Sequence, residues 1–234
     1  MKSIKKWQIA LLCFILSMSG ISINAEEIST EAGEEDVIVN SYMEKSRILN
    51  VQVSQKQKKE NYEYNKMQEY KPAGLLDSQK GKVSEYKLGT ERVKNVGCGA
   101  VGIYNALYLK GNPKSFDHVL YKCEDITMLK GKFGCNSYRL GEVLQYFGYK
   151  VNEDFKFAHK YEDIDAICDY GRVFIASFWN KDSIFGGAHI IAVEVKDDGK
   201  VRAYNSGRPN YLSFDEFKKD KLTQNKFIAL YAIR

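Results

Sequence analysis

The chain has 234 residues, of which 44% are hydrophobic and 28% are charged, and its 35 Lys and Arg exceed its 30 Asp and Glu by five. This small excess gives no sign of nucleic-acid binding. No Cys-x-x-Cys pair and no Cys/His cluster occurs, which argues against a zinc site, and we expect neither a metal nor a cofactor.

Residues 1–25 have the pattern of a secretory signal peptide. Three lysines lie within residues 1–6, and the apolar stretch 7–23 is too short, and too polar near its end, to predict a membrane span. Cleavage after Ala25 leaves 32 Lys and Arg against 30 Asp and Glu. We therefore expect a secreted or cell-surface protein with no stable membrane insertion after signal cleavage; an uncleaved anchor is the alternative.

Residues 26–82 are rich in Glu, Lys, Gln, Ser and Asn and contain few large apolar clusters. Such a segment cannot bury much surface, although residues 36–70 could form one long, weakly amphipathic helix. We interpret residues 26–82 as a polar segment that is either an inhibitory pro-region or a spacer. Residues 83–234 then form one globular domain with one core.

Within residues 83–234 the pattern predicts helices first and strands later. The helices are expected at 98–110, 137–147 and 161–170, with a short one at 213–218. The strands are expected at 172–179, 189–195, 201–205 and 226–233. This order predicts an α+β fold in which N-terminal helices pack on an antiparallel sheet.

The most informative motif is a cysteine, Cys98, between Gly97 and Gly99 at the start of the first helical pattern. Unpaired N–H groups and the helix dipole stabilise a negative charge there, so we expect a lowered pKa and a nucleophilic thiolate. The glycines also allow a substrate backbone to approach the sulfur. A buried structural cysteine beside a tight turn fits the same residues.

Three histidines are available as a base, and one of them is well placed. His189 opens a β-branched strand after a glycine-rich approach, whereas His118 and His159 lie among lysines and aspartates, as is typical of solvated surface. The alternative for His189 is a half-buried strand residue hydrogen-bonded to a carbonyl.

The hairpin after His189 predicts the position of an amide. A three-residue loop ending at Gly199 places Ile191 opposite Asn205, and strand alternation then puts Asn205 on the face of His189. A two-residue turn would put Asn205 on the opposite face. Asn205 could otherwise be an ordinary turn residue.

The order Cys98, His189, Asn205 resembles that of papain-fold cysteine peptidases. The compact size is most similar to the branch of double-glycine leader peptidases, which process bacterial bacteriocin precursors, and their secreted relatives. The resemblance covers residues 83–234. It implies that Cys98 is the nucleophile, that His189 is the general base and that Asn205 orients the imidazole, with a peptide or protein as substrate.

One position departs from this family. A glutamine usually precedes the cysteine by a few residues and completes the oxyanion hole, but residues 90–97 contain none. Asn95 carries the same amide group three residues before Cys98 and is our substitute candidate, with an ordinary loop asparagine as the alternative. Each oxyanion donor contributes about 3 kcal/mol to transition-state stabilisation.

The other cysteines have separate expected roles. Cys123 and Cys135 are twelve residues apart in a loop-rich stretch and could form a disulfide outside the cell, and Cys168 fits a small buried position on a helix face. The leading hypothesis is a secreted cysteine peptidase acting through a thioester acyl-enzyme. The alternatives are a cell-wall peptide amidase or an acyltransferase with the same triad, and an inactive papain-fold binding module.

Overall fold

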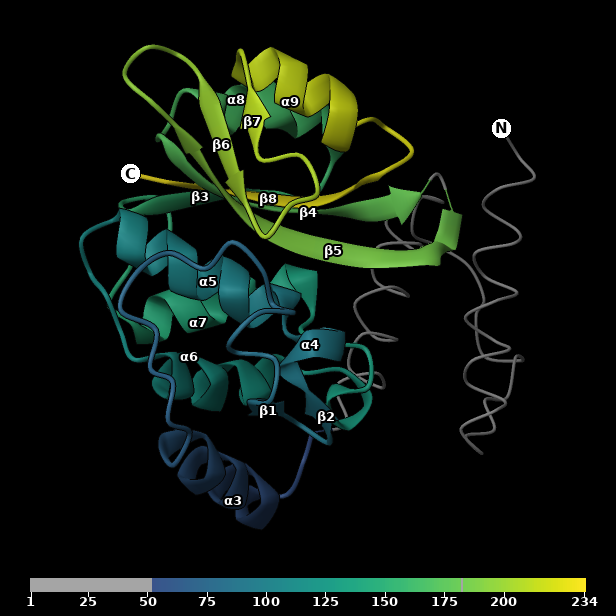
Figure 1. The fold of residues 1–234 in the computed structure, drawn as a ribbon. Helices are drawn as coiled ribbons and strands as arrows, with labels where there is room; N and C mark the ends of the chain where they lie inside the picture. The colour runs from purple at the N-terminus through teal and green to yellow at the C-terminus, as the bar shows by residue number, and fades with distance from the viewer. Residues whose placement is uncertain (1–51, 182) are drawn as a thin grey trace. The chain divides into compact units, whose positions relative to one another are not determined.

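The computed structural model describes residues 52–181 and 183–234, with the side chains of 181–186 left undescribed. The predicted signal peptide and residues 26–51 therefore lie outside the described part. Within it the fold is α+β, with helices on both faces of an antiparallel sheet (Figure 1). The predicted fold class is confirmed at this level.

The main sheet has the strand order β3-β8-β4-β5-β6-β7, and each neighbouring pair is antiparallel. Its strands are β3 (Phe155–Ala158), β4 (Val173–Lys181), β5 (Ser183–Val195), β6 (Val201–Tyr204), β7 (Asn210–Tyr211) and β8 (Phe227–Ile233). A small ribbon of β1 (Lys87–Leu88) and β2 (Glu91–Arg92) lies apart from it.

One helical layer covers one face of the sheet, and two helices cover the other (Figure 1). On the first side, α5 (Cys98–Leu109) packs on the sheet, α4 (Val93–Val96), α6 (Phe116–Cys123) and α7 (Leu140–Tyr146) lie on the same side, and α3 (Gln55–Lys66) lies outermost, against α6. The opposite face holds α8 (Ile164–Cys168) and α9 (Phe214–Lys221). Short 3-10 turns are η1 (Glu124–Ile126), η2 (Leu129–Gly131), η3 (Ser137–Arg139) and η4 (Tyr161–Asp163).

Strand alternation gives the sheet two buried faces, each with its own core. Ile175 and Ile190 pack with α5, whereas Ile191 and Phe217 belong to the core under α8 and α9. Helix α5 approaches the sheet closely because it carries glycine at the contact. A Cβ on Gly102 would lie 3.3 Å from the Ile190 side chain, so only a very small residue fits there without movement.

Residues 52–82 are packed against the rest of the chain. Helix α3 contacts α6 and β1, and its Asn65 amide binds the backbone of Lys87. Leu76 is buried and its N–H and C=O both bond the side chain of Asn105. The expected boundary at residue 83 therefore does not mark the edge of the packed structure. Helix α3 also covers only part of the predicted helix 36–70, whose first residues lie outside the described part.

Candidate active site

Cys98 is the first residue of α5 and is half-buried. Its thiol pKa is raised to about 11, first by burial and next by the neighbouring Cys135. The backbone N–H groups of Ile190, Gly99 and Cys98 itself lower that pKa but do not outweigh the burial. The predicted lowering of the Cys98 pKa is therefore wrong, because the site is less solvated than the helix-end argument assumes. At neutral pH the group is a thiol.

His189 lies on β5, and its Nε2 is 2.6 Å from the backbone carbonyl oxygen of Asn205. A carbonyl can only accept, so Nε2 carries the hydrogen and Nδ1 has a free lone pair. Burial lowers the pKa of His189 the most; the Asn205 carbonyl raises it, and Lys221 and Lys80 lower it. The imidazole is neutral at pH 7 and can accept a proton.

The hairpin that joins β5 to β6 has the predicted register. Gly199 has φ +79°, and Lys196 N–H donates to Lys200 O at 2.8 Å, which closes a three-residue loop. Ala192 pairs with Tyr204, so the next position places Ile191 level with Asn205. The turn chemistry alone was sufficient to predict this pairing.

Asn205 contacts His189, but not through the predicted atom. Strand β6 ends at Tyr204, and Asn205 has φ +61°, so its side chain no longer follows the strand alternation. The carbonyl meets the imidazole, whereas the side-chain amide bonds Gln79. The prediction that the Asn205 amide orients the imidazole is therefore corrected to the backbone carbonyl of the same residue.

The structure does not support the oxyanion role of Asn95. This residue lies on α4, is exposed, and donates from its side-chain amide to Glu91 at 3.3 Å. Its amide is therefore engaged on the surface. The backbone N–H groups of Cys98 and Gly99 lie close enough to the sulfur to lower the pKa of the thiol, so they are the better oxyanion candidates.

The Cys98 thiol and the His189 imidazole both lie near the part of β5 that has no β6 partner. The pairing of β5 with β6 begins at Ala192, so earlier residues of β5 have no β6 partner. The Ile190 N–H approaches the Cys98 sulfur there, and His189 is the preceding residue. Because side chains alternate along β5, Ile190 points toward α5, whereas the side chain of His189 leaves the strand on the opposite face of the sheet, beside Phe178. Among the described residues no hydrogen bond links Cys98 and His189 directly.

The other three cysteines of the described residues, Cys123, Cys135 and Cys168, are free thiols in the structure. Cys123 and Cys135 are buried and their side chains are in hydrogen-bond contact, so the disulfide between them stays a prediction. Cys135 also packs on α5, where a Cβ at Gly99 would lie 2.9 Å from its sulfur. Burial raises the pKa of the half-buried Cys168 to about 11. Over residues 52–181 and 183–234 no group of His, Cys, Asp and Glu is arranged to hold a metal ion.

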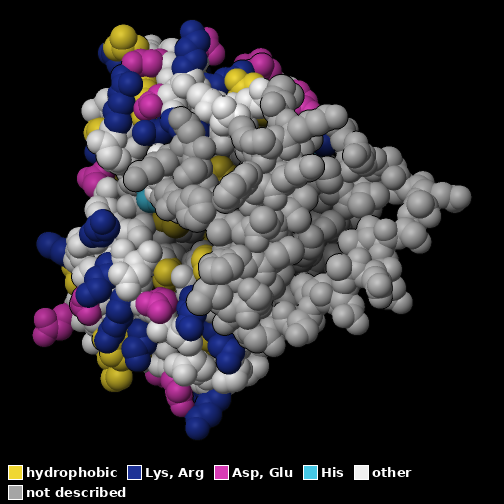
Figure 2. Space-filling view, turned by 90° about the vertical axis from the view of Figure 1, so that its right-hand side faces the viewer, with side chains coloured by type: hydrophobic (Ala, Val, Ile, Leu, Met, Phe, Trp, Pro, Cys, Tyr) yellow, Lys and Arg dark blue, Asp and Glu magenta, His cyan; other side chains and the backbone are white. Residues whose placement is uncertain are grey.

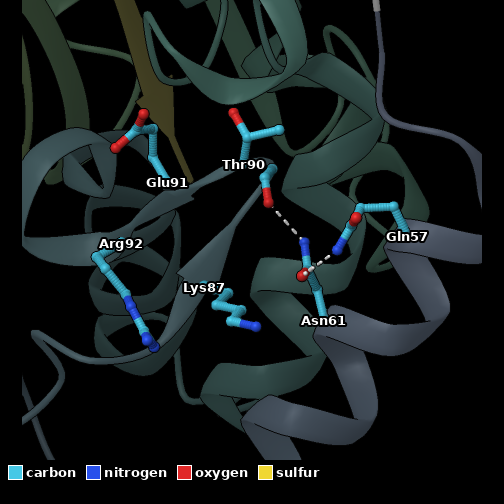
Figure 3. Close-up of a pocket in the computed structure, with 7 residues that line it drawn as sticks. Gln57, Asn61, Lys87, Thr90, Glu91 and Arg92 are labelled. Carbon is cyan, nitrogen blue, oxygen red and sulfur yellow. Dashed lines mark hydrogen bonds between the residues drawn. The ribbon is translucent and has the colours of Figure 1, made fainter.

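A separate pocket of about 250 Å³ lies between α3 and the β1-β2 ribbon (Figure 3). Its lining residues are Gln57, Asn61, Lys87, Gly89, Thr90, Glu91 and Arg92. Asn61 is already used there, because its amide donates to both Gly89 O and Glu124 Oε1 at 2.7 Å. None of Cys98, His189 and Asn205 lines this pocket, so it is not the site of the predicted chemistry.

Comparisons with protein-family models and with curated protein sequences found no match for this chain. No helix in the described residues is long and apolar enough to cross a membrane. The functional assignment therefore depends on the geometry around Cys98 and His189.

Proposed function

We propose that the protein is a secreted cysteine peptidase with a papain-like arrangement, in which Cys98 is the nucleophile and His189 is the general base. One observation carries this proposal: His189 Nε2 is bonded to the Asn205 carbonyl at 2.6 Å, which leaves Nδ1 as a proton acceptor. The neighbouring residue, Ile190, places its N–H against the Cys98 sulfur. The thiol thus lies against residue 190 of β5, and the oriented imidazole is carried by the preceding residue of the same strand.

The raised thiol pKa and the lowered imidazole pKa favour a neutral resting pair over a thiolate–imidazolium pair. In the proposed reaction His189 Nδ1 takes the thiol proton as the sulfur bonds to the substrate carbonyl carbon. The imidazolium then protonates the leaving amine, and a thioester forms. His189 next removes a proton from water as the water oxygen bonds to the acyl carbon. The C–S bond then breaks, the carboxylic acid product leaves, and the imidazolium returns its proton to the sulfur. The Cys98 N–H stabilises the oxyanion.

The test is the rate at which iodoacetamide labels Cys98 in the full chain, compared with Cys168 as an internal standard. Burial raises the pKa of both thiols to about 11, and both are half-buried. Assistance from His189 should make Cys98 at least about tenfold faster than Cys168 at pH 7, and His189→Ala should bring the ratio toward one. Peptide mapping separates the two labels.

The same measurement has a defined pH dependence. His189 must be neutral to accept the proton, and its pKa is lowered from its usual 6.5. The Cys98 to Cys168 ratio should therefore hold above pH 6.5 and fall only below it, as the imidazole becomes protonated. Equal labelling rates that do not respond to His189→Ala would contradict the proposal.

An inactive binding module with this fold is the second candidate. The observation that favours it is the raised thiol pKa together with the absence, among the described residues, of a Cys98–His189 hydrogen bond. The labelling test separates it from a peptidase. A wall-peptide amidase or an acyltransferase would share the thioester, and the acceptor that releases the acyl group, water or an amine, distinguishes them.

A further inference from the structure

The conformation of Asn205 decides where its carbonyl points. Asn205 has φ +61°, a left-handed conformation that is unfavourable for most residues and tolerated best by glycine and asparagine. In this conformation the carbonyl oxygen faces His189 Nε2. A change in the backbone here would remove the bond that fixes the imidazole tautomer.

Gln79 holds the side chain of Asn205 on both of its polar atoms. The Gln79 N–H donates to Asn205 Oδ1 at 2.9 Å, and Asn205 Nδ2 donates to Gln79 Oε1 at 3.1 Å. Gln79 Nε2 in turn donates to Lys94 O at 3.1 Å, on the short helix just before Cys98. Both side chains are buried, so these bonds form away from competing water.

The segment that carries Gln79 is fastened along α5. The hydroxyl of Tyr104 donates to Pro72 O and that of Tyr108 to Ala73 O, each at 3.2 Å. The buried Asn105 side chain bonds both the N–H and the C=O of Leu76 at 2.8 Å. Helix α5 therefore positions the residue that clamps Asn205, and it also carries Cys98 at its N-terminus.

We infer that Gln79 is a positioning residue for His189, acting through the side chain and then the carbonyl of Asn205. This inference rests on the proposed function, since it assigns a role within the same site. Among the described residues Gln79 makes no hydrogen bond to the imidazole or the sulfur; it fixes the carbonyl that holds hydrogen on Nε2 and leaves Nδ1 free. The segment before residue 83 is then part of the catalytic unit.

The test uses the full chain with Gln79→Met, Asn205→Gly and the double variant. Methionine is close in size to glutamine and removes both side-chain bonds. Glycine keeps access to the left-handed conformation and removes the clamped amide. Nitrogen NMR shifts of labelled histidine report the His189 tautomer, and the Cys98 to Cys168 labelling ratio reports its action as a base. Gln145→Met, at an exposed position on α7, is the matched control.

The expected result is a loss of the pure Nε2–H tautomer in both single variants and a roughly tenfold lower labelling ratio at pH 7. The pKa of His189 should fall further, because the Asn205 carbonyl bond raises it. The backbone N–H of residue 79 can still bond Asn205 in Gln79→Met, whereas Asn205→Gly removes both bonds of the clamp, so the double variant should be no worse than Asn205→Gly alone. Gln145→Met should match the wild type.

A wild-type tautomer and labelling ratio in Gln79→Met would overturn the inference, as would fully additive effects in the double variant. Asn205→Gly breaks the same amide pair from its other side, so it provides the test if Gln79→Met does not fold. The two hypotheses also fail differently. A tautomer change in Gln79→Met with a labelling ratio that ignores His189→Ala would support the clamp and contradict the peptidase.

Discussion

Glu124 has a buried carboxyl group in which one oxygen has hydrogen-bond partners and the other has none among the described residues. The residue is 2% exposed, and Oε1 accepts from Asn61 at 2.7 Å and from the Gly89 N–H at 3.2 Å. Oε2 is buried without a partner in the described structure. Burial is the largest effect on this group and raises its pKa from 4.5 to about 7, against the lowering by Asn61, Gly89 and Lys58.

The raised pKa of Glu124 makes the free energy of unfolding depend on pH. Between pH 4.5 and 7 the folded protein keeps a proton on Glu124 that the unfolded chain releases, so the free energy of unfolding falls as the pH rises. Glu124→Gln cannot titrate. Its free energy of unfolding, relative to the wild type, should therefore increase by about 3 kcal/mol between pH 4.5 and pH 8, measured by urea denaturation.

The control for this prediction is Glu162→Gln, at an exposed position on η4. Its difference from the wild type should not change with pH by a comparable amount. A pH-independent difference for Glu124→Gln would show that the carboxyl stays ionised in the folded protein, and the assigned effect of burial would be wrong.

At the residue scale the sequence was enough to place His189 and Asn205 next to each other, but not to predict which of their atoms meet. The register of the hairpin follows from the position of Gly199, and the structure has that register. The side chain of Asn205 is hydrogen-bonded to Gln79, which is 126 positions away in the sequence. No local pattern encodes such a contact. The only available signal was that Gln79 is the last glutamine before Cys98.

At the element scale the contact between α5 and its neighbours depends on the absence of a side chain at Gly99. A Cβ there would lie 2.7 Å from the Cβ of Cys135 and 3.3 Å from the Ile190 side chain. Gly99→Ala gains up to about 1 kcal/mol of helix propensity. Overpacking costs about 1–3 kcal/mol, and the close atom is a buried Cβ that cannot rotate away.

We therefore expect Gly99→Ala to lower the free energy of unfolding by about 1–2 kcal/mol net. Urea denaturation at constant pH measures this change. Gly74→Ala is the control, because a Cβ at Gly74 meets no atom within 4 Å and its stability should hardly change. A Gly99→Ala protein as stable as the wild type would mean that α5 can move away from Cys135 at little cost.

The sequence pattern predicted most of the longer elements that flank the site and missed α6 and several short elements. Helix α5, strand β6 and α9 lie close to their expected ranges, and the turn at Gly199 bounds β6 while the Ser213 side chain caps α9. Strand β5 begins at Ser183, before its expected start at residue 189. Helix α6 was missed, although its buried residues Phe116, Val119, Leu120 and Cys123 follow a helical period. Strand β3 and the β1-β2 ribbon were missed because two to four residues carry too weak a period.

At the scale of the whole molecule, basic and acidic side chains are interspersed over the described face of Figure 2. Buried hydrogen bonds between residues far apart in the sequence link the segments of the chain. Several of these contacts come from residues 52–82, which composition alone marks as a polar segment. Composition misleads here because the buried polar groups Asn61, Asn65 and Gln79 are satisfied by specific partners.

Two readings of residues 26–82 predict opposite effects of truncation. A removable pro-region or spacer predicts that a chain starting at residue 83 keeps its stability and labels Cys98 at least as fast as a longer chain. Because residues 52–82 pack against the rest of the chain, we expect instead that truncation lowers both the stability and the rate of Cys98 labelling. Removing this segment leaves both polar atoms of the fully buried Asn105 without Leu76, at about 1–3 kcal/mol for each buried group.

We expect chains starting at residues 52, 67 and 83 to unfold at successively lower urea concentration. The chain from residue 67 loses α3 but keeps Leu76 and Gln79, so it should retain the His189 tautomer and the Cys98 labelling ratio.

The chain from residue 83 loses the Leu76 burial, worth about 2 kcal/mol, together with the Asn105 bonds and the clamp on Asn205. Together these losses approach the free energy of unfolding of a typical domain, about 5–15 kcal/mol, so we expect the chain from residue 83 to be largely unfolded or inactive. Faster Cys98 labelling in the shortest chain would instead identify the segment as inhibitory.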